Sequence, residues 1–367
     1  MKNYVPQFAL DPATGRMMPF TPGRKRDTVQ GEYLDDEIYA IHKQRAELYE
    51  KYKDDPMNEA VVNYWAELGM KKELYDNEPD GAHAWSIFTP LSMKEGKKYA
   101  LIYMSHGGGN AINLAETYGF NQLAAVERFI VCYPNNGDGS NAEVDTEFPR
   151  VLGRIRELGY PIDWERVYCV GFSSGSEASA CAACTCPRLC AAVGVLPGGQ
   201  PFKDLEFYTG ADYYATTEGL RIPGCFVGGS MDPASYPAPY LLYNEPKPHR
   251  AVNLDIWMRE IAQVKNDKSV TPESIYANLQ SENPVRREFG LEFDREYSFR
   301  AEDMDWVGGD FYGKDGAPVM RFARAIGARH IVWDSQINIV WDYIKHFRRD
   351  QQTGESLYDP VACWGER

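Results

Sequence analysis

Ser173 lies at the centre of Gly171-Phe172-Ser173-Ser174-Gly175, which follows an apolar run and precedes a run of small residues. This G-x-S-x-G pattern is typical of a strand-to-helix turn so tight that the residues two before and two after the serine must be small. Such a turn pushes the serine hydroxyl out above a sheet edge. There it meets the N-terminus of a helix, whose free N–H groups favour a developing anion. The pattern therefore predicts that Ser173 is a nucleophile.

Two further residues could activate this serine. Asp232 follows a short apolar stretch that ends in glycines, and His330 is the best placed of the six histidines because it follows the last apolar stretch. A neutral imidazole can accept the serine proton, and a carboxylate fixes the tautomer of that imidazole. Considered without the other two residues, Asp232 could equally be an aspartate that caps a turn. The order Ser173, Asp232, His330 is that of α/β-hydrolases, however, and it favours a catalytic triad.

A glycine-rich loop, His106-Gly107-Gly108-Gly109-Asn110, follows a strongly apolar stretch over residues 99–105. Its glycines would let backbone N–H groups approach a reacting carbonyl oxygen. We expect an oxyanion hole made by Gly107 or Gly108 together with the N–H of Ser174. A phosphate-binding loop is disfavoured, since the chain has no G-x-G-x-x-G here and no Lys-Ser/Thr ending. His106, Asn110 and Trp333 are expected to contact the substrate.

The elements that must hold these residues alternate along the chain. Apolar runs predict strands, and helical periodicity or small-residue runs predict helices between them. Alternation of this kind predicts an α/β fold, with a mostly parallel sheet covered by helices on both faces. Sites in such sheets lie at the carboxyl ends of the strands, where the glycine-rich loop, Ser173 and Asp232 all fall. The predicted strands cover residues 85–89, 99–105, 129–133, 167–172, 191–196, 225–229 and 320–326, and the predicted helices cover 114–127, 147–158 and 336–347.

Residues 1–80 are predicted to form an N-terminal extension, irregular over 1–35 and with amphipathic helices over 36–54 and about 58–75. Residues 81–367 are predicted to form the catalytic domain. Within it, residues 233–318 are too long for a plain connection and are expected to form a cap or lid. Aromatic residues there could contact a flat or sugar-bearing ligand, or could simply pack the cap onto the domain. They are Tyr236, Tyr240, Tyr243, Trp257, Trp306 and Tyr312.

The composition excludes some partners. The chain has 367 residues, 44% of them hydrophobic, and a formal net charge of −14. Such a charge repels nucleic acids and anionic membranes, and no apolar run approaches the roughly 20 residues of a membrane span. The start of the sequence lacks the apolar core of a signal peptide, which predicts a cytoplasmic protein if Met1 is the native start. Secretion stays open if a leader has been removed, and the oligomeric state is not predicted.

Four cysteines are crowded at Cys181, Cys184, Cys186 and Cys190. Their spacing is not a standard zinc pattern and no histidine lies nearby. We expect them to pack as small apolar side chains on the helix behind Ser173. No metal and no cofactor is predicted.

The segment from Asp163 to Gly175 contains the pattern D-x-x-R-V-Y-x-x-G-x-S-x-G. It resembles the signature of polyhydroxybutyrate-depolymerase-like esterases and of feruloyl and acetylxylan esterases (carbohydrate esterase family 1 and its relatives). The close resemblance covers roughly residues 99–200. It implies an α/β-hydrolase fold, a triad of Ser173, Asp232 and His330, and an oxyanion turn after His106. The 97 residues between Asp232 and His330, and the N-terminal helices, depart from the family pattern.

These observations predict a serine esterase that forms an acyl-enzyme on Ser173. The expected substrate is a carboxylic ester of moderate size, either an acyl or hydroxycinnamoyl group on a carbohydrate or a short hydroxyacid ester. A serine peptidase on the same fold is one alternative, although no site for a peptide terminus is evident. A hydrolase-like binding module without catalysis is another, and the intact set of three residues counts against it.

Overall fold

The computed structural model describes residues 44–45, 47–76, 83–108, 115–135, 144–198, 217–232, 234–235, 254–266, 270–301, 304–328 and 330–360. The predicted irregular start, residues 36–43 and 46 of the first predicted helix, and Asn110 lie outside these residues. So do the three tyrosines at positions 236, 240 and 243 of the predicted cap.

A single ten-stranded sheet dominates the described residues, in the order β1-β2-β4-β3-β5-β6-β7-β10-β9-β8. The six strands from β4 to β10 are parallel, and the strands outside them pair antiparallel. The strands are β1 (Met70–Tyr75), β2 (Trp85–Pro90), β3 (Tyr99–Ser105), β4 (Ile130–Pro134), β5 (Ile162–Gly171), β6 (Ala192–Val195), β7 (Gly224–Gly229), β8 (Arg295–Ala301), β9 (Met304–Tyr312), β10 (Pro318–Ala325), and a separate hairpin of β11 (Phe347–Arg349) and β12 (Ser356–Tyr358).

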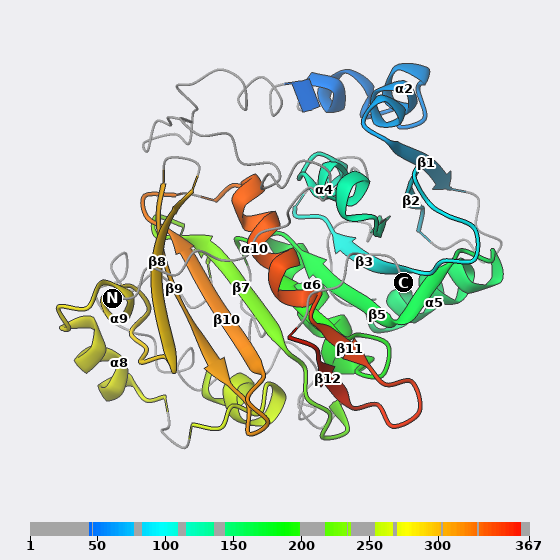
Figure 1. Cartoon of the computed structure of the whole chain (residues 1–367). Coiled ribbons are helices and arrows are strands. Elements are labelled where there is room, and N and C mark those ends of the chain that lie inside the picture. The colour runs from blue at the N-terminus through cyan, green and yellow to red at the C-terminus, as the bar shows by residue number, and fades with distance from the viewer. Residues whose placement is uncertain are drawn as a thin grey trace.

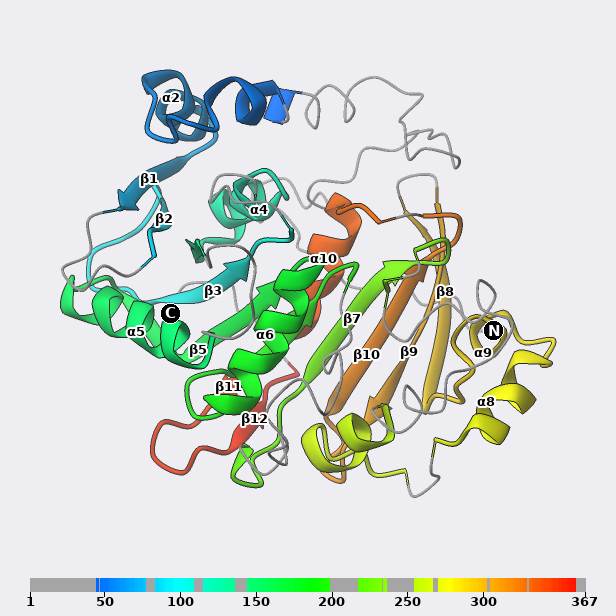
Figure 2. The same cartoon turned by 180° about the vertical axis from the view of Figure 1, so that it is seen from behind.

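Helices cover both faces of the parallel strands (Figures 1 and 2). On one face lies α10, which approaches β6 so closely that a Cβ on Gly194 would press into the Val340 side chain. On the other face lie α5 and α6, in front of the sheet in Figure 2. The helices are α2 (Glu59–Glu67), α4 (Phe120–Glu127), α5 (Val144–Glu157), α6 (Ser174–Thr185), a π-helical turn η4 (Trp257–Ile261), α8 (Pro272–Leu279), α9 (Pro284–Phe289) and α10 (Asp334–Ile344).

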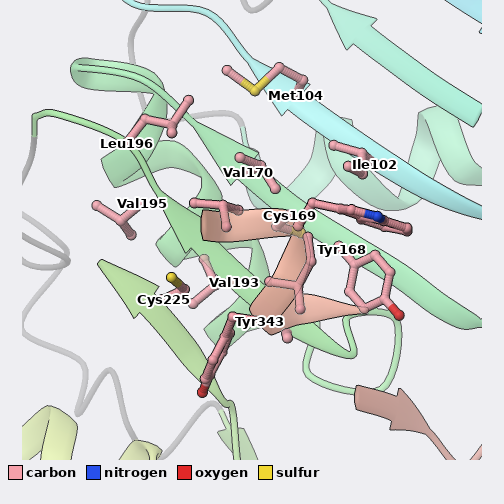
Figure 3. Close-up of a cluster of buried hydrophobic side chains, with 14 of the residues drawn as sticks. Ile102, Met104, Tyr168, Cys169, Val170, Val193, Val195, Leu196, Cys225 and Tyr343 are labelled. Carbon is pink, nitrogen blue, oxygen red and sulfur yellow. The ribbon is translucent and has the colours of Figure 1, made fainter. Parts of the chain in front are cut away.

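The central strands are buried along most of their length because helices cover both of their faces. Every residue of β3 and β6 is buried, as are the last six of β5. Figure 3 shows side chains of β3, β5 and β6, among them Ile102, Val170 and Val193, gathered with Tyr343 of α10. This rigid core fixes where the carboxyl ends of the strands lie, and so fixes the loops that follow them.

The N-terminal prediction needs one correction. The helix expected to reach residue 75 ends at Glu67, and residues 70–75 form β1, the edge strand of the main sheet. Gly69 has a φ of +88°, which ends the helix, and the chain continues with strand-like alternation of burial. Because β1 belongs to the sheet, the predicted boundary at residue 80 does not separate an extension from the domain.

The predicted cap also needs correction. Residues 295–312, expected to lie over the site, form strands β8 and β9, which extend the main sheet beyond β10. Their aromatic side chains pair across the strands: the rings of Phe299 and Trp306 stack with centroids 5.7 Å apart. Trp257 and Trp306 are fully buried, so the packing interpretation holds for both.

A buried acid on α4 leads to a prediction about stability. Glu127 is 1% exposed and faces α10, where Lys345, Asp342 and Trp341 lie near its carboxyl group, with Arg128 beside it. Burial raises the pKa of Glu127 to about 7, and Lys345 offsets the effect only in part. The folded state therefore holds a proton that the unfolded chain loses above its ordinary pKa, so the stability from Glu127 declines as pH rises towards 7.

Glu127→Gln keeps the shape and removes the ionisation. At 1.36 kcal/mol per pKa unit, we expect it to raise the free energy of unfolding by up to about 3 kcal/mol at pH 8 and to change it little at pH 4.5. Urea unfolding at both pH values measures this. Exposed Glu67, at the end of α2, gives the matched control Glu67→Gln, for which the two pH values should agree. An equal effect of Glu127→Gln at both values would contradict the interpretation.

Candidate active site

Ser173 occupies a strained turn between β5 and α6. Its φ of +56° and ψ of −125° lie in a region that residues with side chains rarely adopt. The neighbouring glycines make the turn possible. A Cβ on Gly171 would collide with the carbonyl oxygen of Gly175, and one on Gly175 would collide with the carbonyl oxygen of His106. The motif thus forms the sharp strand-to-helix turn that its residue types indicate.

The structure brings Ser173, Asp232 and His330 together. Each follows a parallel strand of the sheet, respectively β5, β7 and β10. Nε2 of His330 lies 3.0 Å from Oγ of Ser173, and Nδ1 of His330 lies 3.1 Å from Oδ2 of Asp232. The imidazole therefore bridges the hydroxyl and the carboxylate at hydrogen-bond distance on both sides, which is the geometry that a serine nucleophile and its base require.

Asp232 is held as a carboxylate. Its side chain is fully buried, which opposes ionisation, yet hydrogen bonding to His330 and to Ser235 lowers its pKa below the ordinary value. Oγ of Ser235 donates to Oδ2 over 2.8 Å, and the N–H of Ala234 donates to Oδ1 over 2.9 Å. An ionised Asp232 accepts a hydrogen bond from the Nδ1–H of His330, which leaves Nε2 unprotonated and able to take the proton of Ser173.

The loop after β3 lies against the nucleophile. A Cβ on Gly107 would stand 3.0 Å from Cβ of Ser173, so the backbone there approaches the serine as closely as a glycine allows. The N–H of Gly107 points to Oη of Tyr118 at 3.4 Å, whereas Gly108 is exposed. Ser174 is the first residue of α6, so its backbone N–H has no partner within the helix. Of the three predicted oxyanion donors, Gly107 thus has a partner for its N–H, whereas the Ser174 N–H has none within its helix and Gly108 is exposed.

Two of the expected substrate contacts need correction. Trp333 is fully buried at the start of α10, where its backbone N–H donates to Oε1 of Gln336 over 2.8 Å. His106 is 1% exposed, and its Nδ1 lies 2.6 Å from the carbonyl oxygen of Gly107. Both are packing residues, because neither side chain reaches the surface where a substrate would lie.

Three residues near the site were not predicted from the sequence. The ring of Phe172 stacks on His330, with centroids 4.8 Å apart and planes 28° apart. Tyr118 meets Phe172 edge to face at 5.2 Å, and Ser235 supports Asp232. Phe172 occupies the variable position of G-x-S-x-G, so the motif gives its place but not its contact. Tyr118 and Ser235 carry no sequence signal of their own.

The described ranges hold no group of three or more His, Cys, Asp or Glu side chains that could bind a metal ion. Cys181 and Cys184 are buried within α6, Cys190 is buried beyond it, and Cys186 is partly exposed.

Within the described residues, no helix is long and apolar enough to cross a membrane.

The antiparallel β2, the parallel strands after it and the serine turn following β5 define an α/β-hydrolase fold, which confirms the predicted fold class. No protein-family model matches the sequence, and the comparison with curated proteins finds no match.

Several solved structures are similar to this chain. An acetyl xylan esterase from Aspergillus awamori is 13% identical with a TM-score of 0.47, the match covering 75% of this chain and 99% of the esterase. A feruloyl esterase module from Clostridium thermocellum is 15% identical with a TM-score of 0.39 over 75% and 86%. An S-formylglutathione hydrolase from Staphylococcus aureus is 14% identical with a TM-score of 0.38 over 52% and 83%. These TM-scores lie below 0.5, so the fold class rests on the strand order.

Proposed function

We propose that this protein is a serine esterase in which Ser173, His330 and Asp232 act as a catalytic triad. The observation that carries the proposal is the continuous hydrogen-bonded line from Oγ of Ser173 through His330 to the buried carboxylate of Asp232, at 3.0 and 3.1 Å. The strained backbone of Ser173 supports it, because such strain is retained where function needs it.

In the first half of the reaction, Oγ of Ser173 attacks the carbonyl carbon of the ester while Nε2 of His330 takes the hydroxyl proton. The bond to the alcohol oxygen then breaks, and the imidazolium returns the proton to the leaving alcohol. In the second half, water attacks the acyl-enzyme and gives its proton to the same nitrogen. The acid leaves, and Ser173 recovers its proton. Asp232 stabilises the imidazolium at each stage.

The carbonyl oxygen becomes negative in both halves. The N–H of Ser174 at the start of α6 is oriented for it by the helix and adds the partial positive charge of the helix end. The loop after β3 supplies the opposite side, through Gly108. A preformed hole of this kind stabilises the transition state more than the ground state, and such selective stabilisation is what accelerates the reaction.

The proposed substrate is a carboxylic ester of moderate size, either an acyl or hydroxycinnamoyl group on a carbohydrate or a short hydroxyacid ester. The resemblance of residues 163–175 to the signature of feruloyl, acetylxylan and polyhydroxybutyrate esterases supports this class. Phe172 stacks on His330, so its partly exposed apolar ring lies next to the reacting atoms.

Turnover of p-nitrophenyl acetate, p-nitrophenyl butyrate, methyl ferulate and an aminoacyl p-nitroanilide tests the proposal. We expect ester turnover to exceed amide turnover, together with stoichiometric labelling of Ser173 by a fluorophosphonate, located by peptide mass spectrometry. Dominant turnover of the aminoacyl amide would indicate a peptidase instead. Failure to label Ser173, with no turnover of any substrate, would indicate a binding module and overturn the esterase.

A further inference from the structure

Tyr118 occupies a place beside the nucleophile that the backbone loop alone does not explain. Its hydroxyl oxygen accepts the N–H of Gly107 over 3.4 Å, and Gly107 is the residue whose backbone lies against Ser173. The ring of Tyr118 meets that of Phe172 at 5.2 Å, and Phe172 in turn stacks on His330. The phenol therefore lies on the oxyanion-loop side of the serine, fixed by two contacts with the site.

Among the described residues, no group accepts the proton of this hydroxyl. A phenolic hydroxyl can accept hydrogen bonds and donate one. Tyr118 accepts from Gly107, and none of the described residues accepts in return. The residue is 8% exposed, and an unsatisfied donor at such depth costs free energy. A donor left unpaired beside a reactive serine is understandable when its acceptor arrives with the substrate.

The hydroxyl also stays protonated. Burial raises the pKa of Tyr118 above its ordinary value, and the hydrogen bond from Gly107 only partly opposes this. The phenol therefore keeps its proton at neutral pH. The N–H of Gly107 polarises the phenol oxygen, which strengthens the bond that the O–H can give.

We propose that the hydroxyl of Tyr118 donates a hydrogen bond to the carbonyl oxygen of the substrate as that oxygen becomes an oxyanion. Tyr118 would then be a third donor beside Ser174 and the loop after β3. No proton is transferred: the O–H bond of the tyrosine stays intact while the electron pair of the carbonyl moves onto the oxygen. This role rests on the proposed esterase function and adds a catalytic residue to it.

Removing the hydroxyl should reduce kcat and leave KM nearly unchanged. We expect Tyr118→Phe to lower kcat for p-nitrophenyl acetate on the order of 10²-fold, the effect typical of losing one oxyanion donor. A boronate that mimics the tetrahedral intermediate should bind less tightly by a similar factor. Tyr133→Phe is the matched control. Tyr133 is also buried, but its hydroxyl donates to Asn121 over 2.9 Å, away from the triad, so kcat should stay within about twofold.

Fluorotyrosine at position 118 separates donation from positioning. Fluorination makes the phenol more acidic and its oxygen a weaker acceptor. A donor to the oxyanion predicts that kcat rises with the acidity of the phenol. A residue that merely holds Gly107 predicts that kcat falls or stays level, and either result overturns the proposal, as does a Tyr118→Phe kcat within threefold of wild type. This series also decides the matter if Tyr118→Phe is poorly folded.

Measurements on the wild-type protein distinguish failure of the Tyr118 proposal from failure of the esterase proposal. Strong ester turnover with no dependence on Tyr118 would overturn the role of Tyr118 and leave the esterase intact. If the wild type neither turns over an ester nor reacts with the phosphonate at Ser173, both proposals fail together.

Discussion

Ser173→Ala is expected to abolish ester hydrolysis, lowering kcat on the order of 10⁵- to 10⁶-fold while the protein stays folded. The substitution removes only the hydroxyl group, whose oxygen lies 3.0 Å from Nε2 of His330. The structure around it depends on backbone groups instead. The N–H of Ser173 bonds to the carbonyl of Pro197, and its carbonyl accepts from Ser176. Alanine preserves both bonds.

The measurement is single-substrate kinetics on p-nitrophenyl butyrate, with phosphonate labelling and thermal unfolding on the same samples. Ser179→Ala is the matched control, since Ser179 is a buried serine of the same helix whose Oγ has no hydrogen-bond partner in the described chain. We expect the control to keep its activity and its label. More than about 1% of wild-type kcat in Ser173→Ala, at equal purity, would mean that another group is the nucleophile.

The sequence predicted the centre of the molecule well because the information there is local. The run over residues 99–105 is apolar or aromatic except at Ser105, and the strand β3 has the same bounds. The glycines around Ser173 are required because the turn has no room for their side chains, so the motif by itself predicts the geometry of the turn. Asp232 and His330 follow strands, and the carboxyl ends of parallel strands meet, which explains why order along the chain sufficed to predict their meeting.

The errors lie where partners distant in the sequence decide the structure. Residues 70–75 have helix-compatible residues, but pairing with β2 makes them a strand, with Lys72 buried because it reaches Glu116 at 2.7 Å. Strand β9 joins the sheet by pairing with β10, and β8 joins it by pairing with β9. Local pattern does not reveal such pairing, because strand propensity depends on the neighbours that a strand acquires.

The same reason accounts for the side chains misassigned or missed at the site. His106 directly follows β3 and Trp333 directly precedes α10, and both have the residue types of ligand contacts, yet packing from other segments buries both. Tyr118 has no motif around it and reaches Gly107 only through the fold. Residue type and position in a motif predicted the reacting atoms, whereas the groups that surround them could be found only in three dimensions.

Asp232→Asn is expected to lower kcat on the order of 10⁴-fold, less than the loss of Ser173. The reason is the direction of the hydrogen bonds. The N–H of Ala234 donates to Oδ1, so an asparagine would keep its oxygen there and place its NH₂ group at Oδ2. An NH₂ group donates to Nδ1 of His330, which moves the imidazole proton to Nε2. A protonated Nε2 faces Ser173 as a donor and cannot take its proton.

Steady-state kinetics and the rate of phosphonate labelling should fall together in Asp232→Asn, since both depend on a nucleophilic Ser173. Ser235→Ala provides the graded control. It removes one of the hydrogen bonds that lower the pKa of Asp232 but leaves a carboxylate facing His330, so we expect a loss of no more than about tenfold. A kcat of Asp232→Asn within tenfold of wild type would show that His330 finds its tautomer without Asp232, and the proposed triad would then reduce to a serine and histidine pair.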